Sequence, residues 1–115
     1  MLETFKALAE PHRFQIVEFL RDGPRSVNDV VHRLRLAQPQ VSKHLRVLGD
    51  AGLVNVRVDA QRRIYTLQPA PLKQLDVWLE RYRQIWERNF QHLDSLLDEL
   101  KTKNKKRTRA KRARR

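Results

Sequence analysis

The spacing of apolar residues changes twice along this chain, and that change constrains the fold more than any other feature. Up to Gly52 the apolar residues recur every three or four positions, as on helices that bury one face. Between Leu53 and Leu67 the pattern shortens to an alternation of about two, which is typical of strands. From Leu72 to Leu100 the helical spacing returns. We therefore predict a mainly α fold of the α+β class, with one small β-hairpin set between helices.

The helices before the hairpin have recognisable starts and stops. Pro11 begins a second helix after a short first one, because a proline in the first turn loses no hydrogen bond. Gly23 and Pro24 end that helix. Ser26 is placed to cap a third helix, with Asp29 three residues later as a carboxylate partner close to a capping box.

A fourth helix begins at Gln38, and Val41, Leu45 and Leu48 form its inner face. Only residues 35–37 separate it from the third helix, and so short a connection is typical of a helix-turn-helix. The hairpin follows this pair directly, as a wing does. The predicted architecture is therefore a winged helix-turn-helix.

The polar residues of this fourth helix are expected to face outward. Gln can bond adenine with two hydrogen bonds, Ser can bond several base edges, and Lys can reach guanine or phosphate. Arginines near a hairpin tip can enter the minor groove or hold phosphates. The predicted DNA contacts are Gln38, Gln40, Ser42, Lys43, His44, Arg46, Arg62 and Arg63, and Gln40, Ser42 and Lys43 are those expected on base edges. The alternative interpretation is an ordinary solvated helix face and turn.

Residues 72–100 form the longest predicted element, about 40 Å of helix at 1.5 Å per residue. A domain of this size cannot cover such a stripe, so a second copy of the same helix is the simplest partner. The aromatic residues at spacing four fit a packed interface or, alternatively, a pocket for a small molecule. The residues assigned to the homodimer interface are Leu2, Phe5, Leu75, Trp78, Leu79, Tyr82, Ile85, Trp86 and Leu93. A different protein chain as the partner is a further alternative.

The net charge of +12 is concentrated at the end of the sequence. Ten of the 25 Lys and Arg residues lie in residues 101–115, where no acidic residue occurs, so residues 1–100 carry only +2. We predict one domain over 1–100 and a disordered basic tail over 101–115. The tail either adds nonspecific affinity for DNA phosphates or serves solubility. A nonspecific, nucleoid-type nucleic-acid-binding protein driven by this tail is the main alternative function.

Several classes of function are not expected. The chain has no Cys, so disulfides, thiolate metal sites and thiol redox switches are excluded. Its three Gly residues form no phosphate-binding loop, and no catalytic triad or carboxylate pair is recognisable, so we expect no enzyme and no cofactor. We find neither a signal-peptide pattern nor an apolar run near the roughly 18 residues of a membrane span. We therefore expect a cytoplasmic, nucleoid-associated protein without a membrane partner.

Four stretches together resemble the ArsR/SmtB family of winged-helix repressors. They are Leu8–Val17, Gln38–Leu48, Ala51–Val54 and Arg62–Leu67, in the family's order and spacing. The resemblance implies a homodimer, paired through its first and last helices, that binds an imperfect palindrome in double-stranded DNA and blocks transcription. It also implies that residues 38–49 form the recognition helix and residues 53–67 the wing.

Two departures from the family pattern concern the DNA-binding elements. Ala37 stands where family members often have a capping Ser, so either Gln38 caps the recognition helix or its start is about 1 kcal/mol less stable. Ala60 and Gln61 stand at the wing tip, where Gly is usual. The turn type, and hence the direction of Arg62, is left open.

A further departure concerns the sensor positions. Metal-sensing members have Cys-x-Cys before the recognition helix, where this chain has residues 26–31 without a thiol. Others have Asp and His pairs on the last helix, where Trp78 follows Asp76 and Ser95 follows His92 at the partner positions. We therefore expect no metal site and no thiol sensing, and whether a small-molecule ligand exists is left undetermined.

The remaining histidines are assigned to other roles. Asp29 and His32 lie three apart, but Zn²⁺ needs about four converging ligands, so a surface charge pair is the preferred interpretation. His12 and His44 are expected to face DNA or to pack, and not to bind a metal.

Overall fold

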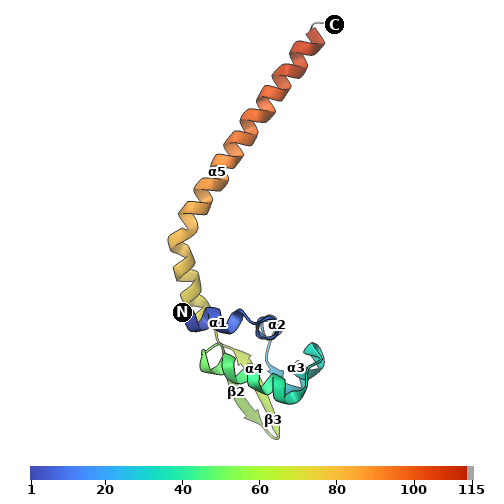
Figure 1. The fold of residues 1–115 in the computed structure, drawn as a ribbon, viewed down its shortest axis with the longest axis vertical. Helices are drawn as coiled ribbons and strands as arrows, with labels where there is room; N and C mark the ends of the chain where they lie inside the picture. Colours follow the sequence, from blue (N-terminus) through green and yellow to red (C-terminus); the bar gives the residue numbers. More distant parts are fainter. Residues whose placement is uncertain (114–115) are drawn as a thin grey trace. The chain divides into compact units, whose positions relative to one another are not determined.

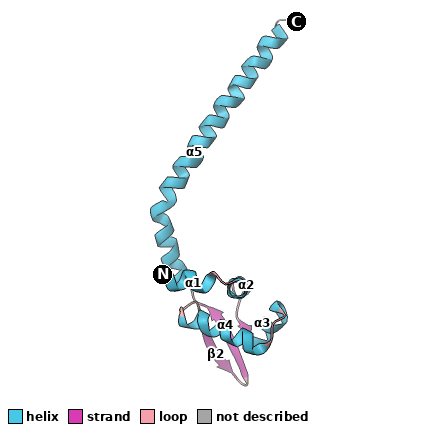
Figure 2. Ribbon diagram, viewed as in Figure 1, coloured by secondary structure: helices cyan, strands magenta, loops and turns pink. Residues whose placement is uncertain are grey.

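The computed structural model describes residues 1–113, of which 104–113 are described as backbone only (Figure 1). The elements in chain order are α1 (Leu2–Leu8), α2 (Pro11–Leu20), β1 (Arg25–Ser26), α3 (Val27–Leu34), α4 (Gln38–Asp50), β2 (Val54–Asp59), β3 (Arg62–Leu67) and α5 (Pro69–Ala113). Helices dominate, and the strands form one antiparallel sheet in the order β1-β3-β2 (Figure 2). The predicted α+β class with a hairpin after the helix pair is confirmed.

The chain divides into two compact units, residues 1–77 and the part that begins at Trp78. The first unit holds α1 to α4, the sheet and the start of α5. Its core draws one or more residues from each of these four helices and from the hairpin: Ala7, Ile16, Val17, Leu20, Val30, Val41, Leu45, Leu48, Leu53 and Val54. Val41, Leu45 and Leu48 are at most 1% exposed, so the predicted inner face of α4 is confirmed.

The start of α3 is fixed by the expected capping box. The Asp29 amide donates to Ser26 Oγ at 3.1 Å, and the Ser26 amide donates to Asp29 Oδ2 at 3.0 Å. The start of α4 has no such support, since its N-cap is Ala37 and no side chain caps it. Gln38 is the first helical residue and does not replace the missing cap, so α4 begins more weakly than a Ser would allow.

The strand β1 was not predicted. Arg25 and Ser26 pair with Tyr65 and Ile64 of β3, which ties the start of α3 to the wing. Two residues are too few to show an alternating pattern, so periodicity could not reveal this strand. Ser26 thus serves both as strand residue and as helix cap, and it is buried.

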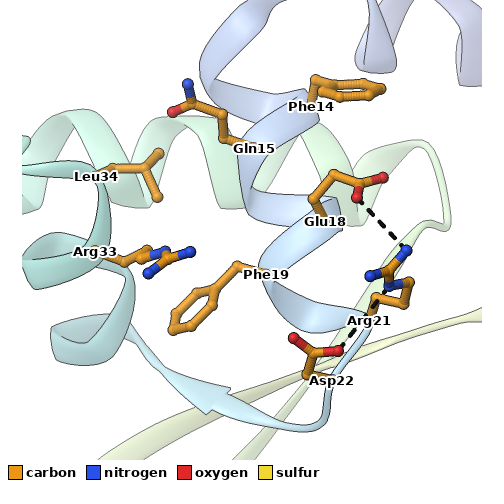
Figure 3. A pocket seen from close by; sticks show the side chains of 8 residues that line it. All are labelled: Phe14, Gln15, Glu18, Phe19, Arg21, Asp22, Arg33 and Leu34. Atoms are coloured by element: carbon orange, nitrogen blue, oxygen red, sulfur yellow. Dashed lines mark ion pairs between the residues drawn. The ribbon is translucent and has the colours of Figure 1, made fainter.

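A hollow of about 470 Å³ lies between α2 and α3 (Figure 3). The guanidinium of Arg33 lies 5.6 Å from the centre of the Phe19 ring, and that of Arg25 lies 4.4 Å from it. On the other side of the hollow, Arg21 pairs with Glu18 at 3.8 Å and with Asp22 at 4.0 Å. The charged side chains around the hollow therefore engage an aromatic ring or one another, and they support α3 against α2.

The helix α5 is longer at both ends than the predicted segment 72–100. No Pro follows Pro71 and no Gly follows Gly52, and Lys, Arg and Ala are strong helix formers, so nothing in the sequence interrupts the helix. The structure therefore differs from the predicted disordered tail over residues 101–113, while residues 114–115 lie outside the described part. No described helix is long and apolar enough to cross a membrane.

Candidate nucleic-acid interface

One side of α4 carries the predicted DNA contacts and the opposite side faces the core. Gln38, Gln40, Ser42, Lys43 and Arg46 are all exposed. The buried residues of the same helix leave these five side chains on the solvent side, because positions three and four apart share a face. The helix therefore presents amide, hydroxyl and cationic groups together.

The wing adds its arginines to this surface. A hollow of about 370 Å³ between α4 and β3 is lined by Val27, Gln38, Pro39, Ser42, Lys43, Arg46, Arg63 and Tyr65. A second hollow of about 210 Å³ is lined by Ser26, Val27, Asn28, Gln38, Gln61, Arg62 and Arg63. Gln38 and Arg63 border both, so the two hollows form one concave strip, which we call the helix–wing groove. The structure thus brings six of the eight predicted DNA-contact residues together.

Two of the eight lie apart from this groove. Gln40 and His44 line a different hollow of about 200 Å³, together with His12, Arg13, Leu36, Lys43 and Val47. Lys43 borders both places. The sequence analysis missed Asn28 and Tyr65, which line the helix–wing groove from α3 and β3. Their place in the groove depends on how α3, α4 and β3 pack together, which no local pattern in the sequence reveals.

The cations of the helix–wing groove are available to a ligand. In the described part of the chain, Lys43, Arg46, Arg62 and Arg63 form no ion pair within 4.0 Å. The charge of Arg62 also helps to lower the pKa of Asp29. Four cations around one concavity favour an anionic polymer such as DNA, since most protein–DNA hydrogen bonds go to phosphate and sugar oxygens. Exposed amide and hydroxyl groups beside them can contact base edges.

The turn of the wing answers a question that the sequence left open. Asp59 and Arg62 are opposite residues at the end of the β2–β3 ladder, so Ala60 and Gln61 form a two-residue turn between the strands. Ala60 has φ of +56°, a left-handed conformation that costs an L-residue about 1–2 kcal/mol. Glycine would adopt it freely, which is why glycine is usual here. Despite this strain the strands stay in register, and Arg62 lines the helix–wing groove.

A cluster of three polar residues joins α4 to the start of α2. His12 Nδ1 lies 3.2 Å from Glu10 Oε1, and His44 Nδ1 lies 3.7 Å from Glu10 Oε2. The two imidazole rings are 5.5 Å apart between centroids. Glu10 also caps α2, since its Oε2 accepts a hydrogen bond of 2.8 Å from the Arg13 amide. His44, predicted as a DNA contact, is therefore turned toward Glu10 of α2.

The carboxylate of this cluster is stabilised in its charged form. Partial burial acts to raise the pKa of Glu10. The hydrogen bond from the Arg13 amide and the positive charges of His44, His12 and Arg13 outweigh that effect and lower it. Glu10 is therefore ionised at neutral pH.

The second unit consists of α5 from Trp78 onward and displays an apolar stripe. The stripe follows alternating steps of three and four residues, with Asn89 as its one polar position. Its six apolar residues are each exposed by 37% or more: Leu79, Tyr82, Trp86, Leu93, Leu96 and Leu100. Trp78 contacts Tyr82 with ring centroids 5.0 Å apart. Of the other predicted interface residues, Leu2, Phe5 and Ile85 are exposed, while Leu75 and Trp78 are half-buried.

Comparison with known proteins connects these features to one group of regulators. Residues 10–56 match the model of the bacterial regulatory protein, arsR family. The chain is 38% identical over 95 residues to the HTH-type transcriptional regulator Rv2034 of Mycobacterium tuberculosis, which covers 83% of this chain and 86% of that protein. It is 41% identical over 76 residues to the transcriptional activator HlyU of Vibrio cholerae, which covers 66% of this chain and 70% of that one.

Solved structures agree with the sequence relatives. The crystal structure of an ArsR family transcriptional regulator, RHA00566, superposes with a TM-score of 0.67 at 27% identity. The match covers 74% of this chain and 88% of that chain. It supports the assignment of α4 and the hairpin as helix and wing of a winged helix-turn-helix.

Proposed function

From the premise that this chain belongs to the ArsR family of DNA-binding transcriptional regulators, we propose that it is a homodimeric, sequence-specific repressor that binds an imperfect palindrome. The observation that carries this proposal is the helix–wing groove, where polar side chains of α4 and four cations border one concavity. In this proposal Gln40, Ser42 and Lys43 contact base edges.

The proposal of a homodimer rests on α5. Large apolar side chains repeated along one face and left exposed mark an interface, because monomeric proteins rarely expose extended apolar patches. The spacing of three and four suits a partner helix of the same kind. Two copies related by a two-fold axis would present two recognition helices to successive major grooves, about 34–36 Å apart.

We propose that the protein does not sense metal ions at the two sensor positions of metal-sensing family members. The segment before α4 has no Cys, and the last helix lacks the Asp and His pairs. Thiol chemistry is excluded for the same reason, since the whole chain contains no Cys.

The proposed function can be tested by selecting binding sites from a pool of randomised DNA duplexes with the full chain. The expected result is an inverted repeat whose half-sites are centred about 10–10.5 base pairs, or a multiple of that, apart. On the selected duplex, Gln40→Ala should cost about 1–3 kcal/mol of discrimination at one or two base pairs. Equal weakening on all duplexes would contradict the base-reading role of Gln40, and absence of any enriched sequence would contradict the proposal as a whole.

The alternative of a nonspecific nucleic-acid-binding protein is separated by deleting residues 101–115. For a sequence-specific regulator, the deletion lowers the affinity for DNA, but the selected site remains preferred. The plot of log affinity against log salt concentration should become less steep by about 0.9 for each lost phosphate contact. Complete loss of binding would instead favour the alternative.

Activation is the second candidate role, because one relative is named a transcriptional activator. A reporter gene placed downstream of the selected site distinguishes the two. The proposed repressor lowers reporter expression when it is produced in the same cell, whereas an activator raises it.

A further inference from the structure

Glu10, His12 and His44 place three ligand-type atoms within 4.8 Å of one another. Glu10 and His12 lie at the start of α2, and His44 lies on α4. The cluster therefore joins two elements that are far apart in the sequence. Sequence spacing alone could not suggest it, because no short motif contains all three residues.

The donor set matches that of a transition-metal site. Two imidazole nitrogens and one carboxylate oxygen are the three protein ligands of a His₂Glu zinc site, with the fourth position left to water. Ligand atoms about 2.0–2.1 Å from a tetrahedral Zn²⁺ lie about 3.4 Å from one another. His12 Nδ1 lies 3.2 Å from Glu10 Oε1 and His44 Nδ1 lies 3.7 Å from Glu10 Oε2, so both separations are already near that spacing.

The surroundings leave room and access for an ion. His12 and His44 both line a hollow of about 200 Å³ that opens beside the cluster. The side chains of His12, Glu10 and His44 are 44%, 28% and 20% exposed, so the ligands are held by the fold while one side remains open to water.

The charge around the cluster is also accounted for. The Arg13 guanidinium donates hydrogen bonds to the carbonyl oxygens of Ala7 at 2.8 Å and Lys6 at 3.2 Å, and its positive charge still acts on Glu10. Lys43 lines the same hollow, and Glu10 supplies the negative charge that offsets it. The carboxylate is already in the ionised form that a metal requires.

We propose that Glu10, His12 and His44 bind one divalent first-row transition metal ion, with Zn²⁺ as the best match, and that the bound ion fastens the recognition helix α4 to the start of α2. This site is separate from the sensor positions discussed above and goes beyond the proposed function. It does not require that the protein bind DNA, and its test uses no DNA.

The test is a titration of the purified full chain with Co²⁺, followed by visible absorption, and then with Zn²⁺, followed by calorimetry. We expect saturable binding of one ion per chain and a tetrahedral Co²⁺ spectrum that Zn²⁺ abolishes. His12→Gln should weaken binding at least tenfold, since even loss of a residue that only supports a metal ligand costs about 10–100-fold. His12 is the most exposed of the three side chains, so this variant should remain folded, which circular dichroism verifies.

The chain offers matched controls in its other two histidines. His32→Gln and His92→Gln, both at exposed positions outside the cluster, should leave the affinity unchanged. Glu10→Gln provides a second test variant that keeps an oxygen able to cap α2. Absence of saturable binding, or binding that His12→Gln leaves unchanged, would overturn the proposal. Equal loss in the His92→Gln control would do the same, because it would locate the ion elsewhere.

Discussion

The two units of this chain treat apolar residues in opposite ways. In residues 1–77 short helices and one hairpin bury ten apolar residues in a core, as with Leu48 at 0% exposure, although others such as Leu2 and Val58 stay exposed. From Trp78 onward, residues of the same type stay exposed along α5, as with Leu93 at 52%. The first unit can thus derive its stability from its own packing, whereas the stripe of α5 leaves its large apolar side chains exposed within the described part of the chain. The same substitution should therefore have different consequences in the two units.

The largest effect is expected for Leu48→Ala. Removing a fully buried side chain and leaving a cavity should lower the free energy of unfolding by about 2–5 kcal/mol. Denaturant unfolding at several protein concentrations measures the loss, which should be the same at each of them. A loss below about 1 kcal/mol would mean that the core of the first unit is looser than its burial indicates.

A smaller and conditional effect is expected for Leu93→Ala. If a second copy covers α5, the change should cost about 1.5–3 kcal/mol per chain, because it removes a side chain buried only in the dimer. Sedimentation equilibrium should show weaker association, and at concentrations where the wild type is monomeric the variant should be equally stable. Unchanged association would argue against a homodimer seam at this position.

The start of α4 offers a gain in stability in the first unit. Ala37→Ser supplies the missing cap and should stabilise the protein by about 1 kcal/mol. Thermal unfolding measures the gain, with Ala37→Val as a control that adds volume without a cap acceptor. If serine and valine have the same effect, the N-cap is not what limits this helix.

The smallest effect concerns the capping box of α3 and its dependence on pH. The Ser26 amide and then the Ser26 hydroxyl favour the charged form of Asp29 and lower its pKa from the usual 3.8. A lowered folded-state pKa means that the contribution to stability is present above about pH 4 and decreases as the pH falls below that value.

Asp29→Asn tests this expectation. The difference in unfolding free energy from the wild type should be less than about 1 kcal/mol at pH 7, since the group is largely exposed, and should shrink toward pH 3. Asp50→Asn, an exposed carboxylate that forms no ion pair in the described part, serves as control. A difference that grows on acidification would contradict the assignment.

The sequence was most informative where a repeating pattern or a turn residue carries a physical meaning. The inner face of α4, the box at Ser26 and the hairpin after Gly52 all follow from periodicity, capping and turn preferences, and the structure confirms them. It was least informative for contacts between distant segments. Neither β1 nor the approach of His12 to His44 leaves a local pattern, because both depend on how α2 and the sheet pack.

The length of α5 shows a different limit. Absence of an apolar stripe after Leu100 suggested disorder, yet Lys, Arg and Ala are good helix formers and no Gly or Pro interrupts them. The periodicity of apolar residues indicates which face of a helix packs against other residues, but it does not show whether a polar segment is helical. The DNA-contact residues remain a prediction, although six of the eight lie around one groove.

The short strand β1 has a mechanical consequence. Ser26 is paired with the wing through Ile64 and at the same time bonded to Asp29 inside α3. A force on the tip of the wing is therefore transmitted to the start of α3, the first helix of the helix-turn-helix. We therefore expect a displacement of the wing to shift the start of α3 as well.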